Sequence, residues 1–109
     1  MHLIGVRRTL VDCHPWLPAT VLKAFELAKA AAFTKLSDTS ASKVMLPFVD
    51  QQLREAQELM GHDFWSYGAG PNRRCLEYFL QQHHKQGLSD RLVTIHELLH
   101  PTSFEVARI

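Results

Sequence analysis

The chain has 109 residues, a formal net charge of +1, 46% hydrophobic residues and 21% charged residues, the composition of one ordinary globular domain at most. The near-neutral balance argues against nucleic acid as a partner, because the Arg7-Arg8 and Arg73-Arg74 pairs are too isolated to form a basic stripe. No run approaches the roughly 18 apolar residues of a membrane span, and the N-terminus lacks the order of a secretory signal, so we expect no membrane contact and a cytoplasmic location.

The first predicted element is a β-strand over residues 2–8, where apolar strand formers precede two arginines. A helix is predicted next, over about residues 18–36, because Pro18 suits a first helical turn and apolar residues follow at helical spacing. The stripe expected to pack inward consists of Val21, Phe25, Ala28 and Ala32.

Three further helices are predicted over about residues 47–60, 71–86 and 94–100. A proline opens each of the first two, and a glycine follows the carboxyl end of each. The fold class is therefore mostly α, with about four helices and one N-terminal strand. A lone strand cannot bury unpaired backbone groups, so it must pair between copies or belong to a sheet built elsewhere.

Cysteine and histidine usage gives no framework for a metal or a disulfide outside the C-terminal region. Cys13 and Cys75 lie far apart without CxxC spacing; one disulfide is open, and reduced, buried thiols are the preferred interpretation. His83 and His84 are adjacent on a predicted helix and point about 100° apart, which disfavours joint chelation. One half-buried and one solvated histidine is expected there.

The stretch HELLH matches the zinc-protease signature, in which two histidines four apart on a helix bind the metal and a glutamate activates water. The residues in those roles are His96, Glu97 and His100. A third ligand is also required, and Glu105 is the nearby carboxylate that could supply it.

Local features oppose this zinc site. Thr94 and Glu97 have the spacing of a capping box, which would occupy the glutamate structurally. Pro101 follows His100 directly, and a residue before proline is biased out of the helical region. HELLH is therefore interpreted as a chance match in a capped closing turn, with no metal expected, and a zinc hydrolase remains a minor alternative.

Several stretches together resemble the C-terminal part of the 4,5-dihydroxyphthalate decarboxylase family. They are MHLIGVRRTLVDCHPWLPATVLKAFELAK, LP at 46–47, MGHDFWSYGAGPNRRCLEYFLQQHHKQGL and TIHELLHP. HPWLP and DFWSYG followed by NR are the most specific pieces. Ser66 departs from the family, which tends to have proline there, and the final helix departs from a V-E-E-L-F pattern, so neither histidine of HELLH is a family feature.

The resemblance implies the C-terminal portion of a two-lobed α/β fold like the periplasmic binding proteins of the second topological class. It implies a carboxy-lyase that converts a dihydroxylated phthalate to protocatechuate and carbon dioxide. The family protein is about three times as long as this chain, so residues 1–109 are expected to be one C-terminal piece, inactive alone. The substrate, a small aromatic carboxylate, would occupy a cleft shared with the preceding part, and no cofactor is expected.

Six residues are candidates for substrate binding, and the sequence assigns none of them a catalytic role. His2 is either a cleft residue or an uninvolved tail histidine. Arg7 is either a bidentate carboxylate ligand or, preferably, a surface charge. Trp65 and Tyr67 either stack on an aromatic ring and offer a phenolic hydroxyl or, slightly preferred, plug the space between helices.

Asn72 and Arg73 complete the set at the start of the third predicted helix, a place that favours anions. An N-terminal cap is the preferred interpretation of Asn72. Besides the decarboxylase hypothesis, a solute-binding module of the same fold without catalysis stays open. We also expect exposed apolar helix faces and hence self-association.

Overall fold

The computed structural model describes residues 2–40 and 45–104. Contacts between Cα atoms divide the chain into two units, each of which is described by itself. The first comprises Met1–Lys23 and Tyr67–Ile109 and is called the core unit; the second comprises Ala24–Ser66 and is called the α2–α3 unit.

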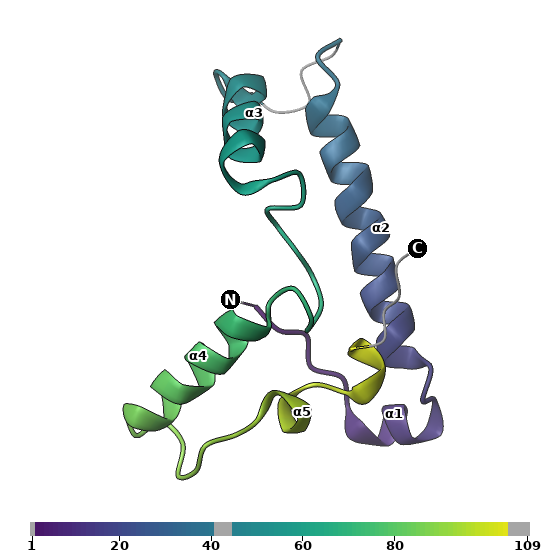
Figure 1. The fold of residues 1–109 in the computed structure, drawn as a ribbon. Coiled ribbons are helices and arrows are strands. Elements are labelled where there is room, and N and C mark those ends of the chain that lie inside the picture. Colours follow the sequence, from purple (N-terminus) through teal and green to yellow (C-terminus); the bar gives the residue numbers. More distant parts are fainter. Residues whose placement is uncertain (1, 41–44, 105–109) are drawn as a thin grey trace. The chain divides into compact units, whose positions relative to one another are not determined.

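The described part of the chain is helical, as predicted (Figure 1). The helices are α1 (Arg8–Cys13), α2 (Leu17–Ser37), α3 (Val49–Met60), α4 (Arg73–Lys85) and α5 (Ile95–Leu98), followed by the 3₁₀ turn η1 (Pro101–Ser103). Helices α2, α3 and α4 agree with the predicted ranges to within two residues at each end, and the mostly α fold class is confirmed. Within the described ranges no helix is both long and apolar enough to cross a membrane.

The predicted strand over residues 2–8 is wrong. Residues 2–7 have no regular secondary structure, and Arg8 already begins α1. The carbonyl oxygen of Arg7 accepts hydrogen bonds from the N–H groups of Leu10 (3.0 Å) and Val11 (3.2 Å), so the arginine pair opens a helix. A strand needs a second strand to receive its backbone hydrogen bonds, and the described residues provide none.

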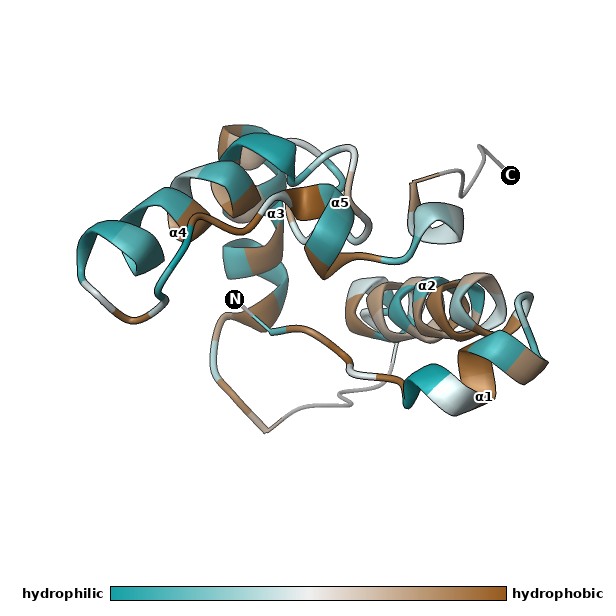
Figure 2. Cartoon of the chain, turned by 90° about the horizontal axis from the view of Figure 1, so that it is seen from below, coloured by the Kyte–Doolittle hydropathy of each residue, from teal (hydrophilic) through white to brown (hydrophobic). Residues whose placement is uncertain are grey.

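The core unit contains a small cluster of buried apolar side chains, which α4 and α5 form together. Leu76 and Leu80 of α4 and Ile95 of α5 are buried, and Val93, Leu99 and Phe104 pack against them. Gly87 adopts a φ of 72° beyond the end of α4, and the chain then runs back along that helix (Figure 2). Glycine reaches this left-handed region without strain, so the reversal places α5 against α4.

The last predicted helix is shorter than expected. It ends at Leu98, and both Leu99 and His100 have extended backbone angles before Pro101 begins η1. The clash between a proline ring and the preceding residue accounts for the extended conformation of His100. The expected range of 94–100 is thus corrected to Ile95–Leu98.

Helix α2 turns a different side inward from the one predicted. Phe25, Ala28 and Ala32 are exposed. The half-buried residues of α2 within the α2–α3 unit are Glu26, Lys29, Phe33 and Leu36. Their spacing of three and four identifies one side of a helix. Three of the four stripe residues therefore remain in solvent, whereas Val21 is half-buried in the core unit, and a polar pair shares the half-buried side of the α2–α3 unit.

Apolar side chains are widely exposed in both units. The chain exposes 9009 Å², whereas two separately compact bodies of these sizes would expose about 7,400 Å² together. Among described residues only Ala69, Leu76, Leu80 and Ile95 are buried. Both Cys13 and Cys75 are free and exposed, so the expected burial of the thiols is wrong. The predicted exposure of apolar surface is confirmed.

Candidate functional site

The HELLH segment is held by the capping box that its sequence predicts. The N–H of Thr94 donates to Glu97 Oε2 at 2.9 Å, and the N–H of Glu97 donates to Thr94 Oγ1 at 3.3 Å. Arg91 Nη1 lies 2.8 Å from Glu97 Oε1. The backbone and hydroxyl hydrogen bonds from Thr94, with the Arg91 contact, lower the pKa of Glu97. Both oxygens of this carboxylate are therefore engaged in the turn.

The two histidines of HELLH occupy different structural settings. His96 stacks on Phe104, with ring centroids 4.7 Å apart and planes 21° apart. His100 lies beyond the end of α5, where its Nδ1 is 2.8 Å from Thr102 Oγ1 and accepts from the N–H of Thr102 at 3.4 Å. A zinc protease needs both imidazoles on one helical face, and this geometry does not provide it.

The pair His83 and His84 agrees with its predicted setting. His83 is half-buried, with its ring centroid 5.8 Å from that of Phe79. His84 is exposed, and its Nδ1 lies 3.2 Å from the carbonyl oxygen of Ser89. In the described ranges, no three His, Cys, Asp or Glu side chains gather as a metal site would require.

The aromatic loop between α3 and α4 divides between the two units. Trp65 belongs to the α2–α3 unit and its side chain is exposed, at 63%. Tyr67 belongs to the core unit and is half-buried. The prediction that both rings plug a space between helices is therefore wrong for Trp65, whose indole is available for contact with another molecule.

The start of α4 is organised by Asn72. This residue occupies the N-cap position, as predicted, but its side chain makes no capping hydrogen bond. Its Nδ2 instead donates at 2.9 Å to the carbonyl oxygen of Gly68, the residue that follows Tyr67. Arg73 Nε donates to Glu77 Oε1 at 2.8 Å, one turn along the exposed side of α4.

The two N-terminal candidates, His2 and Arg7, are exposed in the segment before α1. The structure thus connects Asn72 to the Tyr67 loop, places Arg73 in a surface ion pair and leaves Trp65 in the other unit. None of the six candidates lines either of the surface hollows found among the described residues.

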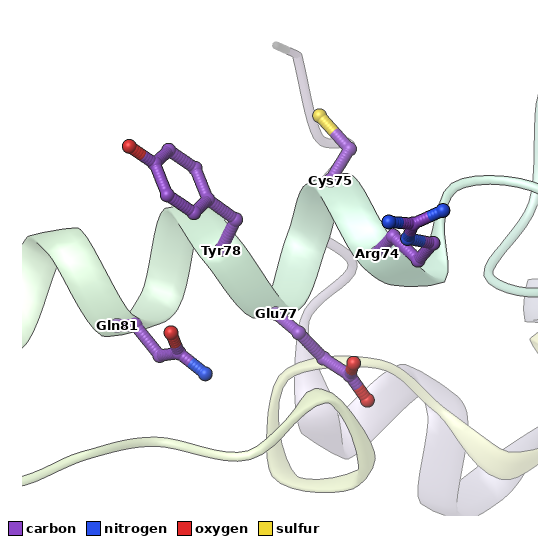
Figure 3. A pocket seen from close by; sticks show the side chains of 5 residues that line it. All are labelled: Arg74, Cys75, Glu77, Tyr78 and Gln81. Atoms are coloured by element: carbon purple, nitrogen blue, oxygen red, sulfur yellow. The ribbon is translucent and has the colours of Figure 1, made fainter.

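Two surface hollows can be described among residues 2–40 and 45–104, and each is lined by one helix or by a helix and the residues just beyond it. One is lined by Arg74, Cys75, Glu77, Tyr78 and Gln81 of α4. Figure 3 shows Cys75 and Tyr78 pointing to one side of α4 and Glu77 and Gln81 to the other. The second is lined by Arg54, Gln57, Glu58 and His62, on α3 and just beyond it. Side chains that diverge along one helix cannot surround a ligand, so neither hollow is an active-site cleft.

Sequence reasoning missed one well-connected residue, Lys29. Its Nζ lies 2.9 Å from Asp63 Oδ1 and 2.9 Å from Glu26 Oε2, and it donates to the carbonyl oxygen of Trp65 at 3.3 Å. Burial alone lowers the pKa of this ammonium, but the two carboxylates outweigh burial, and its pKa is raised. The signal in the sequence was the Glu26–Lys29 pair one turn before Phe33.

Comparison with known proteins gives a clear relative. The chain is 54% identical, over all of its 109 residues, to a curated protein named 4,5-dihydroxyphthalate decarboxylase from Comamonas testosteroni, and it spans 33% of that protein's length. No protein-family model matches the chain. The resemblance to 4,5-dihydroxyphthalate decarboxylase that the sequence motifs indicate is therefore confirmed along the whole of this chain.

Proposed function

We propose that this chain forms the C-terminal part of a decarboxylase that acts on 4,5-dihydroxyphthalate and is inactive by itself. The observation that carries the proposal is 54% identity over every residue of the chain to a decarboxylase about three times as long. A second observation agrees with it: the described residues line no enclosed cleft of their own, so a substrate would need walls from elsewhere.

The complete protein would have two α/β lobes like those of the periplasmic binding proteins, with the substrate in a cleft between them. The exposed apolar residues of α2 and α3 support this proposal, because their surface suits contact with further protein. In the isolated chain the same surface would favour self-association. We place the complete protein in the cytoplasm.

The chemistry is the replacement of a carboxylate by a proton. In 4,5-dihydroxyphthalate each carboxyl-bearing carbon is para to a hydroxyl group, which makes that carbon nucleophilic. A proton donor adds a proton to it, the bond to the carboxylate breaks, and the electron pair of that bond restores the aromatic ring as carbon dioxide leaves. The site must supply a proton donor, a cation for the second carboxylate and apolar surroundings for the departing one.

Three of the candidate residues have side chains that suit these roles. Trp65 offers an exposed indole on which the ring could stack. Arg7 is an exposed guanidinium, a group that binds carboxylates through two parallel hydrogen bonds. His2 is the candidate proton donor at the exposed N-terminal segment. Tyr67, Asn72 and Arg73 remain further candidates, and Asn72 donates to the carbonyl oxygen of the residue that follows Tyr67.

The test is complementation. The part of the Comamonas relative that this chain does not match is fused to the N-terminus of this chain, and the fusion, the chain alone and the relative's part alone are each incubated with 4,5-dihydroxyphthalate. We expect the fusion to release one carbon dioxide per substrate consumed, and both separate parts to release none. Turnover by the chain alone would overturn the shared cleft.

The same experiment separates the decarboxylase from a solute-binding module. A fusion that binds 4,5-dihydroxyphthalate in calorimetry but releases no carbon dioxide would identify a binding protein and overturn the proposed reaction. Zinc hydrolysis is not proposed, because Glu97 and His100 are held in the closing turn.

A further inference from the structure

We propose that Lys29 is a positioning residue that fixes the backbone of Trp65 so that its exposed indole forms a preorganised platform for the aromatic ring of the substrate. This inference rests on the proposed function for the identity of the ligand. The platform itself rests on contacts within the α2–α3 unit.

Lys29 makes polar contacts with the loop after α3. Its ammonium lies within hydrogen-bonding distance of oxygens from Glu26, Asp63 and the Trp65 backbone. The contacts with Asp63 and Trp65 join residues 34 and 36 positions apart in the chain. Lys29 therefore ties the loop to the middle of α2.

An apolar contact also joins the loop to α2, one turn beyond Lys29. Phe33 meets Phe64 edge to face, with ring centroids 5.4 Å apart and planes 87° apart. Residues 29 and 33 lie on the same side of a helix, since they are four apart. The loop residues 63, 64 and 65 are thus held in succession by a carboxylate contact, a ring contact and a carbonyl contact. The backbone of Trp65 is held directly through its carbonyl oxygen, and the side-chain contacts of the two preceding residues limit how far the loop can move.

The contacts of Lys29 and Phe33 leave the side chain of Trp65 exposed to solvent. The side chain of Lys29 is only 12% exposed, whereas Trp65 is 63% exposed. An aromatic ring on a fixed backbone has only two side-chain torsions left to order when a ligand binds, which lowers the entropic cost of stacking. Trp65 then presents a large apolar face at small cost.

The contacts of Lys29 favour an indirect role, because its ammonium already lies against two carboxylates. One ammonium lies between two carboxylates, so the group formed by Glu26, Lys29 and Asp63 is net negative. These two carboxylates already offset the positive charge of the ammonium. Lys29 therefore acts through Trp65, and the cation for the substrate must come from another residue.

The first measurement tests positioning without any ligand. The chain has two tryptophans, so the Trp16→Phe variant leaves Trp65 as the single fluorophore. In this background Lys29→Met should speed the decay of Trp65 fluorescence anisotropy, and Lys29→Arg should restore most of the wild-type decay. Lys35→Met, at an exposed lysine of the same helix, is the matched control and should change nothing. An unchanged decay in Lys29→Met with unchanged helix content overturns the proposal.

The second measurement tests the link to substrate in the decarboxylase fusion. Trp65→Ala and Lys29→Met should each raise KM about three- to tenfold, the range of one aromatic contact, with kcat changed less than twofold. Lys29→Met should add nothing in the Trp65→Ala background, because the residue it positions is gone. Additive effects, or a larger effect of Lys29→Met than of Trp65→Ala, would overturn the proposal.

The wild-type fusion separates a failure of the proposed function from a failure of the Trp65 platform. A wild-type fusion that neither binds nor converts 4,5-dihydroxyphthalate refutes the proposed function, and with it the assignment of the ligand. If the wild-type fusion is active and its Trp65→Ala variant has the same KM, the proposed function stands and the platform is refuted.

Discussion

Each of the two units is stabilised by a different kind of internal interaction. In the core unit, Leu76, Leu80 and Ile95 are buried in one apolar cluster. In the α2–α3 unit no described residue is buried, and the loop is joined to α2 by the Lys29 ammonium and one pair of phenylalanine rings. Burial of apolar area is the stronger of the two, since exposed ion pairs contribute little.

This difference shows which interactions stabilise each unit, and that the α2–α3 unit buries little apolar surface. The buried apolar cluster of the core unit stabilises its fold around α4 without contacts from other protein. The α2–α3 unit instead fixes a loop while exposing Phe25 and Leu27 of α2 and Leu59 and Met60 of α3. Such a unit is suited to present side chains to a neighbour, and the neighbour supplies the burial it lacks.

The largest effect is expected from breaking the core cluster. Leu76 is 3% exposed, and Leu76→Ala removes most of its buried side chain. We expect the free energy of unfolding to fall by about 2–5 kcal/mol, the usual cost of such a cavity. Urea unfolding followed by helix content measures it. Leu88→Ala, at an exposed leucine just beyond α4, is the matched control and should cost less than about 0.5 kcal/mol; equal losses would contradict the cluster.

The sequence predicted the core unit's helices well where their determinants are local. The apolar spacing of Leu76 and Leu80 and the glycine at 87 predict α4 and its end. The Thr94–Glu97 capping box and the proline at 101 predict a short closing turn, although its helix is one turn shorter than expected. Hydrogen bonds and steric clashes over three or four residues are legible in the sequence itself.

The sequence predicted less where the determinant lies far along the chain. The side of α2 that packs inward is chosen by Asp63 and Phe64, more than thirty residues beyond Lys29 and Phe33. Apolar periodicity alone favoured an adjacent side, about a quarter of a turn away. The strand at residues 2–8 failed for a related reason, since β propensity acts only through a partner strand. Of the candidate site, the exposure of Trp65 and the role of Lys29 both depend on these long-range contacts.

An intermediate effect is expected from breaking the contact between Lys29 and Asp63. A double-mutant cycle with Lys29→Met and Asp63→Asn isolates their interaction from the other contacts of each residue. We expect a coupling free energy of about 0.5–1 kcal/mol, because Asp63 is largely exposed and water screens the pair. Urea unfolding followed by Trp65 emission in the Trp16→Phe background reports on this unit.

The control cycle pairs Asp63→Asn with Lys35→Met, whose lysine is exposed on α2. Its coupling should be zero within error. Added salt should weaken the Lys29–Asp63 coupling, since ions screen a pair with one exposed partner. Coupling as large as the cost of Leu76→Ala would refute the contrast between the two units.

The smallest effect is expected at the capping box, where it appears as a dependence on pH. Hydrogen bonds from Thr94 and the contact with Arg91 lower the pKa of Glu97 from its ordinary value of 4.5. A carboxyl group whose pKa is lower in the folded state stabilises that state fully above its ordinary value. The stabilisation is lost as the pH falls from about 4.5 through the lowered folded value.

Glu97→Gln removes the charge and therefore this pH dependence. The unfolding midpoint of the wild type should exceed that of the variant at neutral pH, and the difference should shrink once the pH falls below 4.5. Arg91→Gln is the matched control: it keeps both hydrogen bonds from Thr94, the larger causes of the shift, so most of the pH dependence should remain. A difference that stays constant between neutral and acid pH would show that Glu97 is not held by the turn, and its carboxylate would again be available for another role.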